Sequence, residues 1–253
     1  MPATEIKCES FFTTSWDDGS IHDLRLAELL NKYKIKSTFY IPINNHERKD
    51  HLGPKGIKDV AHHFEVGAHT FSHLALTQLS NKQAYLEIEK GKKGLEDILG
   101  SEIKAFCFPL GKFNFSHLKM IELAGLSFAR TTGYFRTSHV LDKEKLLFHT
   151  TLQFYPHKPV TYIKSIVRRK DWEGVCNLTV NLKHLFNWPS FLKSTLAYVI
   201  LNGGVFHLWG HSWEIQENDL WYQLEEFFKH VAECQSRLIF KTNLEIWNDS
   251  KYS

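Results

Sequence analysis

The sequence lacks the apolar segments that would place it in or across a membrane. No window of about 18 or more apolar residues occurs, and the N-terminal stretch MPATEIKCES contains no basic region followed by an apolar one. We therefore expect no transmembrane segment, no signal peptide and a cytoplasmic location.

Cysteine and clustered positive charge are also scarce. The four cysteines, Cys8, Cys107, Cys176 and Cys234, lie far apart and form no CxxC pair, which is typical of reduced thiols. The net charge is only +3, and the longest basic run is VRRK at 167–170. This argues against a nucleic-acid partner.

What the sequence does contain is a globular composition, with 43% apolar and 23% charged residues in 253. The first half alternates strand-like and helix-like segments, which predicts a parallel sheet with right-handed crossovers. Neither a repeat nor a linker interrupts the chain. We expect a single barrel-like α/β domain over residues 1–253.

The second half gives weaker periodicity. Residues 134–185 suggest only a loop and a possible strand around 146–156. After them we expect a helix at 187–203, a strand at 204–211 and an amphipathic helix with Asn218 as its N-cap.

Polar residues follow several of the expected strands. Asp17 and Asp18 end the first strand, His69 and Pro109 follow later ones, and His211 follows the last. In parallel α/β folds, functional side chains gather at the C-terminal ends of strands. These residues, distant in sequence, are therefore expected at one mouth of the sheet.

Two histidines and the adjacent aspartates suggest a metal site. His69 and His73 are four apart, so on a helical turn they would share one face and could bind one ion with a carboxylate. Adjacent aspartates point in different directions from an extended backbone, so Asp17 and Asp18 could divide the roles of base and ligand. Taken alone, DDG could also be a simple turn, and HxxxH could arise by chance among 15 histidines.

The motifs together resemble the polysaccharide deacetylase family, carbohydrate esterase family four. TTSWDDG, HTFSH, FCFPLG, FARTT and GVFHLWGHSWEI follow one another in the order and spacing of that family, over residues 10–235. The resemblance implies a distorted (β/α) barrel of about seven parallel strands. It also implies metal-dependent removal of an N- or O-linked acetyl group from a carbohydrate.

Position by position, the resemblance makes Asp17 the general base. It makes Asp18, His69 and His73 the ligands of a divalent metal, zinc first, with cobalt, nickel or manganese as alternatives. For the general acid, His211 at the strand end is favoured, and His207 inside the apolar strand is interpreted as a core histidine.

The third motif departs from the family pattern, because it lacks the arginine and has Leu110 where tyrosine is usual. The backbone N–H of Leu110 could still hold an oxyanion. Arg130 is the nearest candidate for the missing arginine, unless it is an ordinary strand-end residue paired with a surface acid. Pro109 and Trp213 are candidate substrate contacts, although packing is the alternative for the tryptophan.

These expectations describe a hydrolase acting on an acetylated sugar or oligosaccharide, such as an intracellular glycan precursor. One alternative is a metal-dependent hydrolase of a cyclic amide or ureide. The other is a catalytically silent glycan-binding protein of the same fold, which the altered third motif would favour. The oligomeric state stays open.

Overall fold

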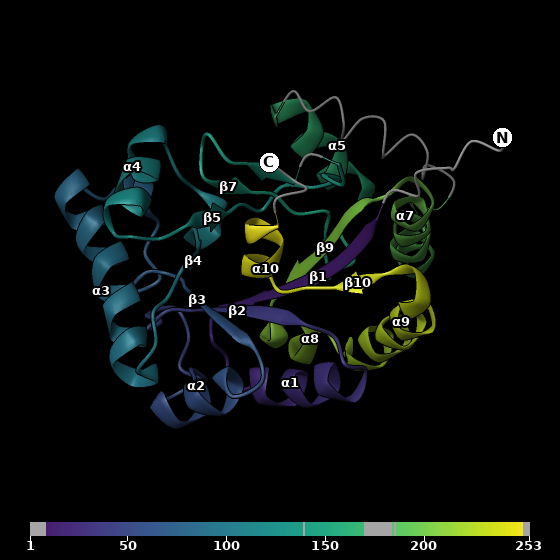
Figure 1. The fold of residues 1–253 in the computed structure, drawn as a ribbon, viewed down its shortest axis with the longest axis horizontal. Coiled ribbons are helices and arrows are strands. Elements are labelled where there is room, and N and C mark those ends of the chain that lie inside the picture. Colours follow the sequence, from purple (N-terminus) through teal and green to yellow (C-terminus); the bar gives the residue numbers. More distant parts are fainter. Residues whose placement is uncertain (1–8, 139, 170–183, 185, 250–253) are drawn as a thin grey trace, which may run out of the picture.

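A curled, mostly parallel sheet forms the centre of this computed structural model, with helices around its outside (Figure 1). The structure describes residues 9–138, 140–169, 184 and 186–249. The strand order is β6-β7-β5-β4-β3-β2-β1-β9-β8, and β10 also pairs with β1. Within these described residues, only β6 runs antiparallel to its neighbour.

The secondary structure alternates between strands and helices through most of the described chain. The strands are β1 (Ser10–Asp17), β2 (Ser37–Ile41), β3 (Glu65–Ala68), β4 (Ala105–Cys107), β5 (Phe128–Arg130), β6 (Leu141–Asp142), β7 (Leu147–Phe148), β8 (Leu152–Gln153), β9 (Gly204–Gly210) and β10 (Ile239–Phe240). The helices are α1 (Asp23–Lys32), α2 (Pro54–Ala61), α3 (Asn81–Leu99), α4 (Phe115–Leu123), α5 (Pro159–Arg169), α7 (Trp188–Asn202), α8 (Ser212–Glu217), α9 (Trp221–Glu233) and α10 (Asn243–Asn248). No helix in this part of the chain is long and apolar enough to cross a bilayer.

The sheet curls into a half-barrel. One short segment, residues 147–153, runs from one side of the sheet to the other and is called the bridging segment. β7 pairs with β5 through Arg130 and Phe148, whereas β8 pairs with β9 through Leu152 and Leu208. The α/β class with a curled parallel sheet is thus confirmed. The strands outnumber the seven expected because several span only two residues, too few to show a periodicity.

Alternation along β1 separates two apolar cores. Phe12 and Trp16 belong to the large cluster that includes residues of the outer helices. Phe11 belongs to a smaller cluster with Tyr40 on the other face of the sheet. Because side chains alternate along a strand, Asp17 lies on the same inner face as Phe11.

Helix α10 fills the inside of the half-barrel from the N-terminal ends of the strands. Its residues Ile246 and Trp247 belong to the inner cluster. Its first residue, Asn243, donates to Thr13 Oγ1 and accepts from Tyr40 Oη, each over 2.9 Å. The opposite, C-terminal ends of the strands remain for the polar residues and form what we call the mouth.

In the second half, one expectation was wrong and another was incomplete. Asn218 does not cap α9, because α8 ends at Glu217 with Asn218 as its C-cap, and α9 begins after Leu220. In the segment 134–185, the possible strand at 146–156 corresponds to two short strands, β7 and β8, whereas β6 and α5 were not expected. Short strands of two residues and a helix of mixed composition leave little pattern to detect.

The cysteines that the structure describes, Cys107 and Cys234, are free and buried. Cys8 and Cys176 lie outside the described residues.

Candidate metal and catalytic site

Four strand ends bring the predicted site residues together at the mouth. Asp17 is the last residue of β1 and Arg130 the last of β5. His69 follows β3, and His211 follows β9 as the N-cap of α8. The parallel sheet therefore brings together residues as far apart in the sequence as Asp17 and His211.

Asp17 and Asp18 face different partners, as expected, although Asp18 lies in the turn after β1 and not on the strand itself. The carboxylate of Asp17 contacts the guanidinium of Arg130 through Oδ1, and the Cys107 thiol donates to its Oδ2 over 3.8 Å. Asp18 has a φ of +80°, a conformation uncommon outside glycine, which turns its side chain away from that pair. Its backbone is held by a hydrogen bond from its own N–H to the Tyr40 carbonyl oxygen.

Asp18, His69 and His73 form a buried cluster that fits a divalent metal. Oδ1 of Asp18 lies 3.0 Å from Nε2 of His73 and 3.5 Å from Nε2 of His69. Two ligands about 2.1 Å from one ion, at angles near 90° to 109°, lie roughly 3.0 to 3.5 Å apart. Two imidazole nitrogens and one carboxylate oxygen also leave coordination positions open for water or substrate.

The tautomer of His69 suits this role. Its Nδ1 lies 2.8 Å from the carbonyl oxygen of Cys107, which can only accept a hydrogen bond. Nδ1 therefore carries the proton, and the lone pair of Nε2 faces Asp18. Such a backbone hydrogen bond is typical of histidines that ligate metals.

The expected helical turn from His69 to His73 is wrong, although the two histidines do converge. The segment is an irregular loop in which Thr70 and His73 both have positive φ values, +65° and +58°. Helix α3 supports the loop: the carboxylate of Glu87 accepts from the N–H and hydroxyl of Ser72. These hydrogen bonds replace those that a helical turn would have made.

A glycine in α3 allows this loop to lie close to the helix. A Cβ added at Gly91 would lie 2.5 Å from the carbonyl carbon of Thr70 and 2.6 Å from its oxygen. Glycine is unfavourable in a helix interior by about 1 kcal/mol relative to alanine. The close approach of the loop backbone gives Gly91 a structural reason for its place there.

A second group, Asp17, His69 and Cys107, also lies within ligand distance. Its carboxylate is already paired with Arg130. Burial raises the pKa of the Cys107 thiol well above its usual range, so the sulfur keeps its proton. The chemistry of the donors therefore favours the Asp18 group as the metal site.

The charges around Asp18 hold it ionised. Burial alone would raise the pKa of Asp18, but the field of His211 and the neighbouring imidazoles of His69 and His73 hold that pKa well below its usual range. Burial lowers the pKa of His73, yet its bond to Asp18 raises that pKa overall. Nδ1 of His73 lies 2.9 Å from Oε2 of Glu47, at ion-pair length but without hydrogen-bond geometry.

His211 faces the cluster from the other side of the mouth. Its Nε2 lies 3.9 Å from Oδ2 of Asp18, and its Nδ1 lies 2.5 Å from Oε2 of Glu214. Burial lowers the pKa of His211, but Asp18 and Glu214 outweigh it and raise that pKa to about 9. The imidazole is therefore protonated at neutral pH and can donate a proton from Nε2.

His207 is buried in the inner face, away from the cluster. Its Nε2 lies 2.8 Å from the Ser15 hydroxyl, and its Nδ1 lies 3.1 Å from the carbonyl oxygen of His149. Burial, together with the charge of Arg130, lowers its pKa well below the usual range. It is a neutral, hydrogen-bonded histidine of the inner face.

Arg130 is fully buried, so its partner is not a surface acid. It contacts Asp17, and its guanidinium lies 4.9 Å from the Trp209 ring and 5.2 Å from the Tyr40 ring. Aromatic faces stabilise a cation that has left water. Arg130 thus stands where an arginine would orient the carboxylate of Asp17.

The third motif forms a tight turn beside the mouth. Pro109 and Gly111 bound a one-turn 3₁₀ helix, and Leu110 between them has a φ of +57°. Pro109 is buried, whereas the Leu110 side chain is 53% exposed. The side chain is therefore not packed in the core, and the role of the Leu110 backbone N–H stays a prediction.

Trp213 packs within the site. Its indole N–H donates to Oδ2 of Asp18 over 2.8 Å, and the guanidinium of Arg48 covers its ring at 4.2 Å. Its ring centroid lies 5.3 Å from that of His211. Trp213 therefore binds Asp18 and packs against His211, and its contact with substrate stays a prediction.

Sequence reasoning missed the residues that support the site rather than form it. Glu47 contacts His73, and Glu214 contacts His211. Glu87 and Gly91 contact the loop between His69 and His73. Only Glu214 carried a detectable signal, since it lies three residues after His211 at a helix start, where the two can meet.

Comparisons with known proteins agree with this geometry. Residues 7–129 match the polysaccharide deacetylase family. The protein YxkH of Bacillus subtilis (strain 168), which is named after that family, is 28% identical over 120 residues, 47% of this chain and 43% of its own length. The chain thus spans less than half the length of this relative.

Solved structures resemble the chain over nearly its whole length. A Mycobacterium smegmatis protein that carries the same family name has a TM-score of 0.64 at 14% identity, over 94% of this chain and 89% of its own. A pseudoenzyme of carbohydrate esterase family four from Bacillus anthracis has a TM-score of 0.57 at 14% identity, over 96% and 66% of the two chains. At such identities the likeness shows the fold, and the pseudoenzyme shows that this fold does not guarantee activity. Residues 7–129 therefore belong to the polysaccharide deacetylase family, and the described chain has the fold of a solved protein that carries this family name.

Proposed function

We propose that this chain is a metal-dependent hydrolase that removes an acetyl group from a carbohydrate. The observation that carries the proposal is the division between the adjacent aspartates. Asp17 is held by Arg130, and Asp18 meets His69 and His73 at ligand distances. A base and a metal site placed side by side suit the hydrolysis of an acyl bond.

The metal would be held by Asp18, His69 and His73. When bound, a divalent ion at this position lowers the pKa of a water molecule and polarises the acetyl carbonyl. The mixed nitrogen and oxygen donors suit zinc, with cobalt, nickel or manganese as alternatives.

The other residues would move protons and stabilise charge. Asp17 accepts the proton of the attacking water, and Arg130 fixes the orientation of that carboxylate. The backbone N–H of Leu110 holds the oxyanion. His211, protonated and fixed at Nδ1 by Glu214, gives a proton from Nε2 to the departing nitrogen or oxygen of the sugar.

The substrate would be an acetylated sugar or oligosaccharide, with Pro109 and Trp213 contributing to the walls of the mouth. We place this activity in a single catalytic domain over residues 1–253. The described strands of both halves join in one sheet, which supports that boundary.

The test measures acetate release from N-acetylhexosamine compounds by the purified protein with added zinc or cobalt. We expect release by the wild type and none by Asp17→Asn, which should still bind one metal ion per chain. Asp18→Ala should bind no metal. The exposed Asp97→Asn on α3 serves as the matched control and should behave as the wild type. The proposal fails if Asp18→Ala binds metal as the wild type does.

Two alternatives are separated by the same assay. Release of ammonia or a ring-opened acid from allantoin-like compounds, without acetate release from sugars, would indicate a cyclic-amide hydrolase. Sugar binding without turnover under any metal would indicate a silent binding protein. The altered third motif was the main support for the silent protein, and the contact of Arg130 with Asp17 supports Arg130 as the substitute for the missing arginine.

A further inference from the structure

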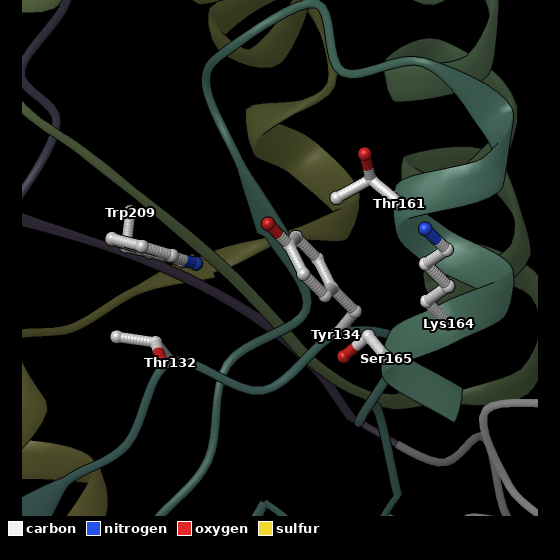
Figure 2. Close-up of a pocket in the computed structure, with 6 residues that line it drawn as sticks. All are labelled: Thr132, Tyr134, Thr161, Lys164, Ser165 and Trp209. Atoms are coloured by element: carbon white, nitrogen blue, oxygen red, sulfur yellow. The ribbon is translucent and has the colours of Figure 1, made fainter. Parts of the chain in front are cut away.

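A pocket of about 450 Å³ opens beside the catalytic residues and is not used by the mechanism above. Figure 2 shows its walls: Trp209 on one side, the side chains of α5 on the other, and Tyr134 between them. The lining residues are Thr132, Tyr134, Thr161, Lys164, Ser165 and Trp209.

The pocket adjoins the reaction centre through Trp209. The guanidinium of Arg130, which holds Asp17, lies 4.9 Å from the Trp209 ring. The ring centroid of His211 lies 5.6 Å from that of Trp209. A group bound in the pocket would therefore lie next to the catalytic residues, within reach of a substrate held there.

Trp209 presents an unsatisfied donor to this pocket. Its Nε1 is buried and has no hydrogen-bond partner among the described residues. Figure 2 shows this nitrogen directed across the pocket toward Tyr134. An indole N–H can only donate, and a buried donor without a partner is unfavourable, so the site is suited to a ligand that accepts.

The wall opposite Trp209 is positively charged. Lys164, Thr161 and Ser165 come from successive turns of α5 and line the pocket together. The sequence from 145 to 170 contains no aspartate or glutamate, and its basic residues include Lys158 and Lys164. Lys164 is the one charged side chain among the residues that line the pocket, and its positive charge favours an anion there.

We propose that this pocket binds an oxyanion, a phosphoryl or carboxylate group, carried by the acetylated sugar. Lys164 supplies the charge, and the Trp209 N–H and the hydroxyl groups of Thr161 and Ser165 supply directed hydrogen bonds. The assignment of the anion to an acetylated sugar rests on the proposed function. The binding of an oxyanion in the pocket is independent of that function.

The first experiment measures binding without turnover. Inorganic phosphate and D-glucuronate are titrated into the full-length protein, with and without zinc, and followed by tryptophan fluorescence. We expect saturable binding of at least one probe and about tenfold weaker binding to Lys164→Gln, because a charge-assisted contact is lost. Lys90 is an exposed lysine of α3 that does not line the pocket. The variant Lys90→Gln removes the same charge, serves as the control and should bind the probes as the wild type does.

The two probes separate the possible sources of the anion. Phosphate binding that depends on Lys164 indicates a phosphorylated sugar, and glucuronate binding that depends on it indicates an acidic sugar. Trp209→Phe keeps the ring and removes the donor, so it should weaken whichever probe binds. Binding that is equal in the wild type and Lys164→Gln, or absent for both probes, overturns the proposal.

The second experiment links the pocket to catalysis. N-acetylglucosamine 6-phosphate and N-acetylglucosamine are compared as substrates, and the readout is the ratio of their kcat/KM values. If phosphate is the bound group, Lys164→Gln should lower this ratio about tenfold and Lys90→Gln should leave it unchanged. Anion binding without any deacetylation would refute the proposed function but not the pocket. If the protein deacetylates both sugars, the ratio of kcat/KM values does not change in Lys164→Gln and neither probe binds, the pocket proposal is refuted and the proposed function is not.

Discussion

At the scale of single residues, the site depends on how buried charges are paired. Arg130 is fully buried and contacts Asp17, and it rests on the rings of Tyr40 and Trp209. A buried ion pair adds little net stability, but removing one partner leaves the other as an uncompensated charge. The pair therefore holds the carboxylate of Asp17 in a defined position. Its loss would destabilise the folded state, because one buried charge would remain unpaired.

Replacing Arg130 by methionine should therefore destabilise the protein by about 3 to 5 kcal/mol, because Asp17 would stay buried without its cation. The free energy of unfolding, measured by urea denaturation, checks this value. The double variant Arg130→Met/Asp17→Asn should be more stable than Arg130→Met alone. If the double variant is the less stable one, the two residues do not form the pair described.

His211 predicts a pH dependence of stability in the metal-free protein. Its pKa is about 9 in the folded chain and about 6.5 when unfolded, so protonation favours the folded state. This contribution, on the order of 3 kcal/mol, is complete below about pH 6.5 and is lost as the pH rises through about 9. His211→Asn should thus be less stable than the wild type at about pH 6, and the gap should narrow at about pH 9.5. Urea denaturation with a chelator present measures both, and a gap of constant size would contradict the assignment.

Much of this residue pattern could be predicted from the sequence, because strand ends in a parallel sheet meet at one edge. Asp17, Asp18, His69 and His211 lie where their places after apolar strands indicated. Glu47 could not be predicted, because its contact with His73 depends on the path of an irregular loop. No periodicity encodes such a path.

At the scale of elements, the loop carrying His73 is shaped by helix α3. Glu87 binds the loop backbone, and Gly91 lets the loop approach the helix. The sequence suggested a helical turn because HxxxH has helical spacing, but positive φ values at Thr70 and His73 rule it out. Tertiary contacts with α3 thus decide the local structure.

Gly91→Ala should weaken zinc binding by roughly 10-fold to 100-fold, in the range found when supports of metal ligands are changed. Alanine favours the helix, but its Cβ would displace the backbone of Thr70. Gly94→Ala on the same helix is the control, since its Cβ would meet only the side chain of Ile43. Competition with a zinc chelator measures both affinities, and equal losses in the two variants would show a general effect on α3.

At the scale of the whole molecule, the metal site joins strands that are not adjacent in sequence. Its ligands come from the ends of β1 and β3, and the bridging segment 147–153 connects the two edges of the same sheet. An ion bound only by the folded chain therefore stabilises the fold as a whole.

Zinc at 100 times its Kd should stabilise the protein by about 2.7 kcal/mol, which corresponds to a rise in Tm of roughly 5 to 10 °C. Differential scanning calorimetry of the metal-free and zinc-loaded protein measures this rise. Asp18→Ala should show little or none of it. A full rise in that variant would place the bound zinc elsewhere.

The residues that line the pocket and the residues of the metal cluster come from different parts of the sequence, which affects how substrate preference could change among relatives. The proposed base and metal ligands lie within residues 17–73, inside the part that matches the family. The wall formed by α5 lies beyond it, within a stretch that makes no contribution to the metal site among the described residues. The proposed anion contacts of α5 thus come from a different stretch than the proposed base and metal ligands. An exchange of residues 159–169 between relatives would therefore transfer a preference for a sugar substituent and leave Asp17, the metal cluster and His211 in place.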